Sequence, residues 1–222
     1  MLRAMLYKEW LKIRWAIVGL VAAYLFFAIY IWMDVRHSLM MSGTLKVWLY
    51  AIFRKWIFYS PLKLVPAIAG LVLAVFQFVP EVSKKRFRLT FHLPMDERNS
   101  LLVMIGCGLA IQAVLSIFLL ASFTILNSSY FPAELLNSAF WTILPWILAG
   151  FVSYLGVALV TVEPSILNKL VFGIASYGLL QLLYDEQMYM QYRFSLWRYT
   201  LVGLLFLLTI FYPGYRFRRS AK

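Results

Sequence analysis

The chain has 222 residues, of which 63% are hydrophobic, 18% are aromatic and only 14% are charged. Because soluble domains carry more charge and fewer apolar residues, this composition excludes a soluble protein and predicts an all-α, polytopic membrane protein. The formal net charge of +12 comes from 21 Lys and Arg against 9 Asp and Glu. These cations stand between apolar runs, so they indicate membrane topology and not a nucleic-acid partner.

Six apolar runs are long enough to form transmembrane helices. An amphipathic leader, residues 1–14, precedes them and is expected to lie in the membrane interface. Within this leader Glu9 projects from the apolar side, where it either pairs with Lys8 or Lys12 or contacts a basic residue of the loop after the second span. The six spans are predicted at residues 15–33, 61–79, 101–126, 139–162, 166–183 and 196–212.

The connection between the first two spans, residues 34–60, is basic yet rich in bulky apolar residues. From Leu45 to Tyr59 the apolar residues recur at helical intervals, which is typical of an interfacial helix. Small residues occur at Ala67 to Ala74 in the second span and at Gly106 to Ala113 in the third. Such residues allow close helix packing, either within one chain or between two chains.

The Lys and Arg residues divide unequally between the two sides of the membrane. With the N-terminus inside, fourteen fall on the inner side and seven on the outer side. Because short cytoplasmic loops carry the excess of Lys and Arg, both termini are predicted to be cytoplasmic, in an integral protein of the cell (inner) membrane. Most of the outer cations lie between Lys46 and Lys63, so the positive charge of this region argues against this orientation.

The densest charge lies in residues 80–100, between the second and third spans. This loop begins with Glu81 and continues through the stretch from Leu89 to Met95. It then enters the third span through Asp96-Glu97-Arg98. The basic residues of the loop's first half are Lys84, Lys85, Arg86 and Arg88.

This loop resembles the first cytoplasmic loop of the type-2 family of ABC transporter permeases. In that family an acidic residue, a short coupling helix and a Leu-Pro step follow the second span, as Glu81 and Leu93-Pro94 do here. The Lys8-Glu9 pair in the leader is also similar to the family. The family's Gly-Thr pair is not reproduced, since only Thr90 is present. The plan of a leader, six spans and a coupling loop covers essentially the whole chain.

The resemblance implies a permease subunit, in a family that mostly exports, which pairs with a second copy or a similar permease. It also implies a separate ABC ATPase docked on the cytoplasmic side, which binds ATP and Mg²⁺. The chain itself has no Gly-x-x-x-x-Gly-Lys-Ser/Thr stretch, so no nucleotide is expected on it. No metal or other cofactor is expected either, since His37 and His92 each stand alone and no cluster has metal-ligand spacing. The residues expected to contact the ATPase are Glu9, Glu81, Lys84, Lys85, Arg86, Phe87, Arg88 and Phe91.

The docking element of the loop is expected to be a short helix from Val82 to Leu93. Phe87 and Phe91 would lie one turn apart on it and form a joint apolar anchor, surrounded by positive charge. The alternative is that the basic residues only satisfy the positive-inside bias and touch anionic lipid headgroups.

An intramembrane enzyme would need ionisable or nucleophilic groups at membrane depth, and the spans contain almost none. We therefore expect no catalytic residues on this chain. The polar side chains at depth either bond neighbouring helices or line a translocation path. An ATP-independent channel or membrane scaffold is the alternative function, although it leaves the basic loop without a role. The residues of this polar set are Gln77, Gln112, Ser116, Ser153 and Tyr154.

Overall fold

The computed structural model describes residues 2–83, 97–184 and 194–209. Every regular element in these ranges is helical, which confirms the predicted all-α class. The elements are α1 (Leu2–Ser42), α2 (Thr44–Phe53), the 3-10 helix η1 (Ser60–Leu62), α3 (Val65–Ser83), α5 (Glu97–Asn127), α6 (Ala133–Val162), α7 (Ile166–Tyr184) and α8 (Leu196–Thr209).

Five helices of the described part are long and apolar enough to cross a membrane. Each overlaps one of the first five predicted spans, as expected of an integral membrane protein with several apolar helices. The sixth predicted span, 196–212, starts as α8, whose apolar part Leu196–Phe206 is shorter, and its last three residues lie outside the described part. The five long segments are Arg3–Ser42, Ser60–Val82, Leu101–Asn127, Ala133–Val162 and Ile166–Tyr184.

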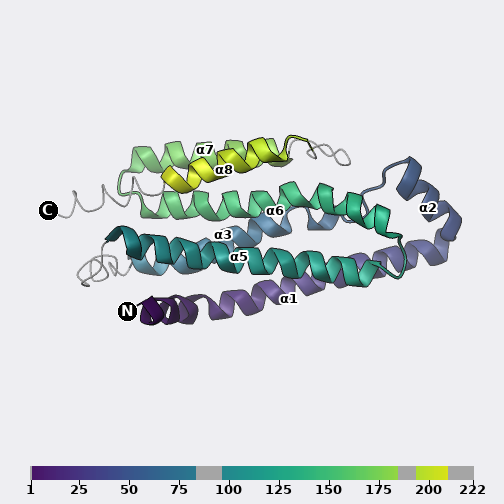
Figure 1. Cartoon of the computed structure of the whole chain (residues 1–222), viewed down its shortest axis with the longest axis horizontal. Helices are drawn as coiled ribbons and strands as arrows, with labels where there is room; N and C mark the ends of the chain where they lie inside the picture. The colour runs from purple at the N-terminus through teal and green to yellow at the C-terminus, as the bar shows by residue number, and fades with distance from the viewer. Residues whose placement is uncertain (1, 84–96, 185–193, 210–222) are drawn as a thin grey trace.

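The long helices run along one another as an antiparallel bundle (Figure 1). α1 begins at one end, called here the N-terminal end, where α3 also ends and α5 begins; α2 lies at the opposite end, called here the α2 end. α6 is the central helix, because it packs against α3, α5, α7 and α8, whereas α1 packs against α3 and α5. α7 and α8 cover only the part of α6 nearer the N-terminal end.

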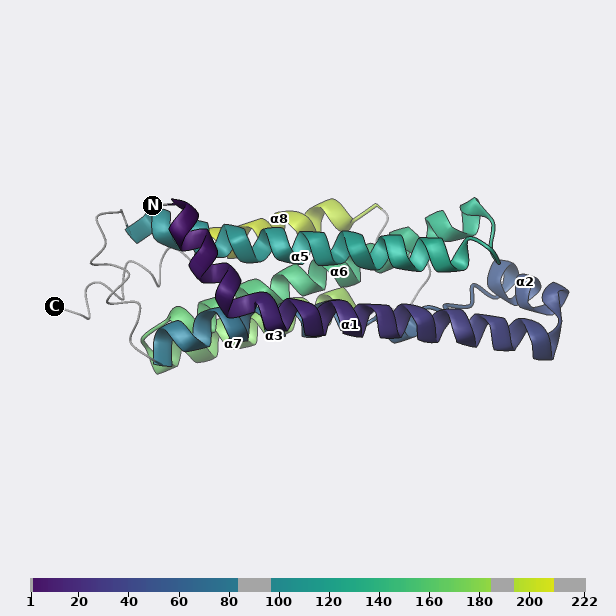
Figure 2. The same cartoon turned by 90° about the horizontal axis from the view of Figure 1, so that it is seen from below.

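α1 joins the predicted leader and the predicted first span into one helix of 41 residues. Figure 2 shows its first turns running obliquely to the rest of the helix. The helix continues past residue 33, the predicted end of the span, because no Pro or Gly follows until Gly43. The φ of +80° at Gly43 ends the helix, and glycine adopts such an angle at little cost.

α2 forms within the predicted interfacial segment, but it ends at Phe53 and not at residue 59. Lys55 takes a left-handed φ of +51°, and the amide of Trp56 donates to the carbonyl of Tyr50 at 3.3 Å. This bond turns the chain back across the end of the helix, as in a Schellman-type cap. It places the Trp56 side chain beside α2, a position that matters for a pocket described below.

α3 and α6 approach closely where two glycines face each other. A Cβ at Gly70 would overlap the carbonyl oxygen of Gly150 and lie 3.1 Å from the amide nitrogen of Tyr154. The small residues expected at Ala67–Ala74 therefore serve packing within the chain. In the second small-residue stretch Gly106 is exposed, and nothing lies within 4 Å of a Cβ added there.

Candidate functional site: a buried polar network at the N-terminal end

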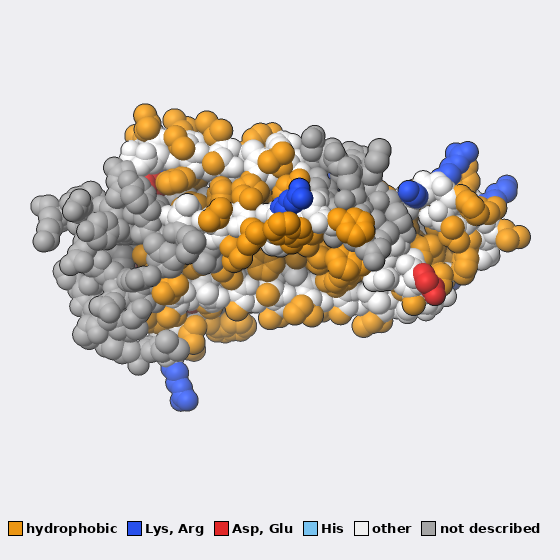
Figure 3. All heavy atoms as spheres, turned by 45° about the horizontal axis from the view of Figure 1, so that its top comes forward, with side chains coloured by type: hydrophobic (Ala, Val, Ile, Leu, Met, Phe, Trp, Pro, Cys, Tyr) orange, Lys and Arg blue, Asp and Glu red, His pale blue; other side chains and the backbone are white. Residues whose placement is uncertain are grey.

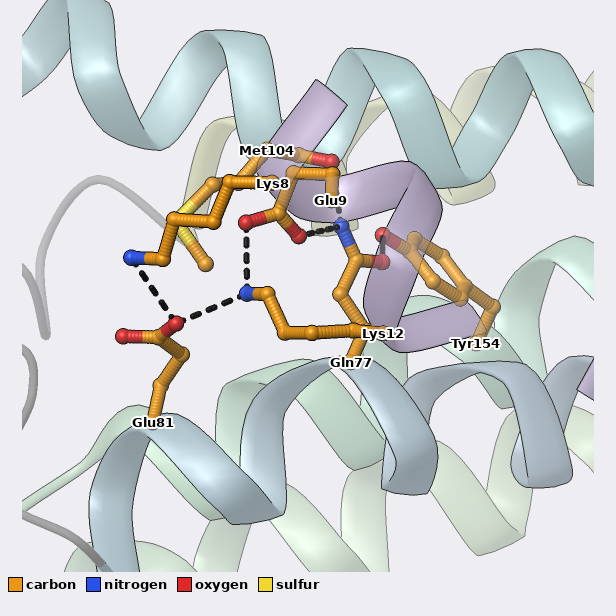
Figure 4. Close-up of polar contacts among 7 residues, drawn as sticks. All are labelled: Lys8, Glu9, Lys12, Gln77, Glu81, Met104 and Tyr154. Atoms are coloured by element: carbon orange, nitrogen blue, oxygen red, sulfur yellow. Dashed lines mark hydrogen bonds and ion pairs between the residues drawn. The ribbon is translucent and has the colours of Figure 1, made fainter. Parts of the chain in front are cut away.

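Charged side chains from α1 and α3 meet inside the bundle near its N-terminal end (Figure 4). α1 supplies Lys8, Glu9 and Lys12 from its first turns, and α3 supplies Glu81 from its last turn. The side chains of Glu9 and Glu81 are almost fully buried, at 2% and 0% exposed. A carboxylate is costly to bury unless it is paired, so its partners determine whether this arrangement is stable.

Lys12 lies at the centre of the network. Its Nζ is 2.5 Å from Oε1 of Glu9 and 2.7 Å from Oε1 of Glu81. Nζ of Lys8 lies 3.0 Å from the same oxygen of Glu81. Two ammonium groups thus balance two carboxylates. The side chain of Lys8 is 41% exposed against 10% for Lys12, so solvent screens the Lys8 pair more strongly.

Hydrogen bonds of two uncharged side chains, Gln77 and Tyr154, extend the network further into the bundle. Gln77, one turn before Glu81 on α3, donates from Nε2 to Oε2 of Glu9 at 3.1 Å and to the carbonyl of Met104 at 2.7 Å. The Tyr154 hydroxyl donates to Oε1 of Gln77 at 2.8 Å. Both amide hydrogens and the amide oxygen of Gln77 are therefore used. The network joins α1, α3, α5 and α6.

Gly108 of α5 provides the space for this chain of hydrogen bonds. A Cβ at Gly108 would overlap the hydroxyl of Tyr154 and lie 2.6 Å from Oε1 of Gln77. Any larger residue would displace one of the two bonded groups. α5 therefore supplies the carbonyl of Met104 as an acceptor, and its Gly108 leaves room for the two bonded side chains.

Oε2 of Glu81 is buried and has no hydrogen-bond partner among the described residues. The other oxygen of this carboxylate receives two ammonium groups, which offset the cost of burying the charge. In the described ranges no three His, Cys, Asp or Glu side chains gather to hold a metal ion. The arrangement is suited to holding the first turns of α1 against α3 and to passing a displacement between them.

Of the residues predicted to contact an ATPase, only Glu9 and Glu81 lie in the described part of the chain. Glu9 pairs with Lys12, which is one of the alternatives that the sequence left open. Glu81 contacts α1 of its own chain. The basic and aromatic residues of the predicted coupling helix lie outside the described residues; they are Lys84, Lys85, Arg86, Phe87, Arg88 and Phe91.

The five polar residues at membrane depth are all buried inside the single chain. Gln77 and Tyr154 bond each other between α3 and α6. Gln112 of α5 donates from Nε2 to a carbonyl at the start of α3 at 3.4 Å, and Ser116 donates to the carbonyl of Gln112 at 2.8 Å. Ser153 is 5% exposed on α6. Three of the five thus make bonds between helices.

Two features of the network were not predicted from the sequence. One is the pairing of Lys12 with Glu81, and the other is the position of Gln77 between Glu9 and Tyr154. The signal available in the sequence is the spacing of four residues between Gln77 and Glu81, which places both on one face of an otherwise apolar helix.

Replacing Tyr154 by phenylalanine is expected to lower the free energy of unfolding by about 1–2 kcal/mol, because Oε1 of Gln77 is then buried without a donor. Thermal unfolding of the purified chain in detergent measures the effect. The Tyr30→Phe variant is the control, since that ring is 51% exposed on α1 and its hydroxyl carries no such bond to Gln77. Equal losses in the two variants would contradict the prediction.

Comparison with known protein families, with curated proteins and with solved structures found no match to this chain. Its function must therefore follow from the sequence pattern and from the geometry of the network.

Proposed function

We propose that this chain is the permease subunit of an ABC transporter similar to the type-2 family. In this proposal it exports a substrate with energy from ATP, which a separate ATPase subunit hydrolyses. The observation that supports the proposal most is the position of the buried network. It lies at the end of the bundle where α3 stops and α5 starts, and the predicted coupling loop, residues 80–100, joins these two helices.

The network offers a mechanical connection between that loop and the rest of the bundle. Glu81 stands in the last turn of α3 and holds Lys8 and Lys12 of α1. One turn earlier Gln77 connects to α5 and, through Tyr154, to α6. A displacement of the loop by the ATPase would reach all these helices through short polar contacts. Glu9 and Glu81 act as positioning residues in this scheme, because their buried carboxylates contact their own chain.

The proposal places the N-terminal end of the bundle in the cytoplasm. α1 starts, α3 ends, α5 starts and α8 runs toward this end. Of the predicted cytoplasmic Lys and Arg residues, those in the first turns of α1 and α7 lie at this end. Six spans, as the sequence predicts, would then leave both chain termini on the cytoplasmic side.

A second copy of this chain, or a similar permease, would complete the transport path. Because the five polar residues at depth lie inside one chain, they do not line a path between two copies. Such a path would instead be bordered by exposed apolar faces, for example by Val114 and Ile117 on α5, each 66% exposed. A path along the interface between two permeases is what the resemblance to the type-2 family implies.

The test is whether the chain associates with an ABC ATPase through the predicted coupling helix. Replacing Phe87 and Phe91 together by alanine should weaken that association by about 2 kcal/mol per residue, because anchor side chains of a docking helix contribute about this much. Co-purification of the ATPase and its stimulated ATP hydrolysis measure the loss. Insertion of the chain in the membrane should not change.

The Phe76→Ala variant is the matched control, since this phenylalanine is half-exposed on α3 and lies outside the loop. It should bind the ATPase as the unaltered chain does. Unchanged association in the Phe87 and Phe91 double variant would refute the docking role of the loop. A reporter fused at residue 90 that is found outside the cytoplasm would refute the orientation, and transport without any ATPase would favour the channel alternative.

A further inference from the structure

A pocket of about 540 Å³ lies at the α2 end, between the last turns of α1 and the helix α2. Its volume falls within the range of small-molecule sites in proteins. The proposed coupling to an ATPase takes place at the other end of the bundle and gives this pocket no role. The residues that line it are Ser38, Ser42, Lys46, Val47, Tyr50 and Trp56.

The polar side chains of this pocket are hydrogen-bond donors. Lys46 supplies an ammonium group, and Ser38, Ser42 and Tyr50 supply hydroxyls. None of the described lining residues carries a carboxylate. Asp34 lies one turn before Ser38 on α1 and is not part of the lining. One cation with several neutral donors suits an anion that has several oxygens, such as a phosphate group.

A second hollow of about 280 Å³ adjoins the pocket and is more apolar. It is lined by Leu49, Tyr50, Phe53 and Arg54, so Tyr50 borders both cavities. Phe53 is 76% exposed, and Leu49 is also exposed. Figure 3 shows apolar and basic side chains gathered together at the end of the molecule where α2 lies. A donor-lined pocket beside an apolar hollow matches a ligand with a phosphate head and an acyl chain.

The length of α1 places this pocket at the level of lipid headgroups. The predicted membrane-crossing run ends at residue 33, and a rise of about 1.5 Å per residue puts Ser38 and Ser42 roughly 8 and 14 Å further along the helix. Tilt of the helix reduces these heights above the hydrocarbon. The headgroup layer extends roughly 5–8 Å beyond the hydrocarbon core on each side. Ser38 therefore lies at about the depth of lipid phosphates, whereas Ser42 of an untilted helix lies roughly 6 Å beyond the headgroup layer.

We propose that these two cavities bind one anionic phospholipid. The phosphate is held by Lys46 with the hydroxyls of the larger pocket, and an acyl chain lies against Leu49 and Phe53. Trp56, which follows the turn at Lys55, also lines the larger pocket. This lipid site does not depend on the proposed permease function.

The test is a titration of the purified full chain in detergent, with the bound species counted by native mass spectrometry. The probes are short-chain phosphatidylglycerol, short-chain phosphatidylcholine and inorganic phosphate. Phosphatidylglycerol should bind about tenfold more tightly than either of the others, because it alone combines a net negative phosphate with an acyl chain. Lys46→Gln should lower its affinity about tenfold. Phe53→Ser should weaken the lipid but leave the binding of inorganic phosphate unchanged.

The Lys55→Gln variant is the matched control, since it removes the same charge from an exposed residue of this end that lines neither cavity. It should keep the affinity for phosphatidylglycerol. Tyr50→Phe removes one donor but keeps the ring that lies 4.9 Å from the Arg54 guanidinium, so it should weaken phosphate and lipid alike.

Three results would overturn the proposal. Equal losses in Lys46→Gln and Lys55→Gln would mean that diffuse charge attracts the lipid. Equal affinity for the two lipids would exclude a site that recognises the anionic charge. Inorganic phosphate that binds as tightly as phosphatidylglycerol would exclude the lipid and assign the pocket to a water-soluble phosphate compound.

Discussion

Replacing Lys12 by methionine is expected to lower the free energy of unfolding by about 3–5 kcal/mol, because breaking a buried ion pair strands the remaining charge. This ammonium group lies within 2.7 Å of carboxylate oxygens of both Glu9 and Glu81. Methionine keeps a similar length and apolar volume, so the loss reports the missing charge and not a cavity. Unfolding of the purified chain in mixed detergent micelles measures it.

Lys8→Met is the matched control for this variant. Lys8 also pairs with Glu81, but its side chain is 41% exposed and the pair is screened by solvent. Its replacement should therefore cost about 1 kcal/mol or less. If the two variants lost equal stability, the central position of Lys12 in the network would be wrong.

Replacing Gly70 by alanine is expected to destabilise the chain by about 3 kcal/mol or more, at the upper end of the usual cost of overpacking. The added Cβ would overlap the carbonyl oxygen of Gly150, and both partners belong to helix backbones that cannot rotate away. α3 and α6 would have to separate, which would also lengthen the hydrogen bond between Gln77 and Tyr154. The unfolding free energy in detergent measures the loss.

Gly178→Ala is the control, and it is expected to change the stability in the opposite direction. Nothing lies within 4 Å of a Cβ added at Gly178, which is exposed on α7. Because alanine favours helix over glycine by up to about 1 kcal/mol, this variant should keep or raise the stability. A loss as large as that of the Gly70 variant would show that the close approach of α3 and α6 is not the cause.

The apolar runs predicted the positions of most helices, because a run long enough to cross a bilayer must satisfy its backbone as a helix. The fifth span shows this well: Glu163-Pro164-Ser165 interrupts the run, and α7 begins at Ile166 and ends one residue beyond the predicted boundary. The first span shows the limit. The length of an apolar run predicts only the part of a helix that crosses the hydrocarbon. α1 continues beyond that part through polar residues until Gly43 ends the helix.

The pairing within the buried network could be predicted only where it is local. Glu9 and Lys12 are three residues apart on one helix, and their pairing was among the alternatives. The contact between Lys12 and Glu81 joins residues 69 apart in the chain. α3 is apolar on most of its surface, so the sequence pattern does not tell which of its faces turns inward. Only the packing of α3 against α1 and α6 brings Glu81 and Gln77 to the inside.

The central position of α6 has a consequence for biosynthesis. α3, α5 and α6 pack against one another and α1 packs on α3 and α5, whereas α7 and α8 each pack chiefly on α6. The helices made first can therefore share a buried core before α7 and α8 are added to it. The two helices made last add to a surface of α6 that is by then in place, so the order of synthesis matches the order in which the contacts can form. The early chain need not wait for its C-terminal part, which shortens the time during which buried charges such as Glu81 stand unpaired in the membrane.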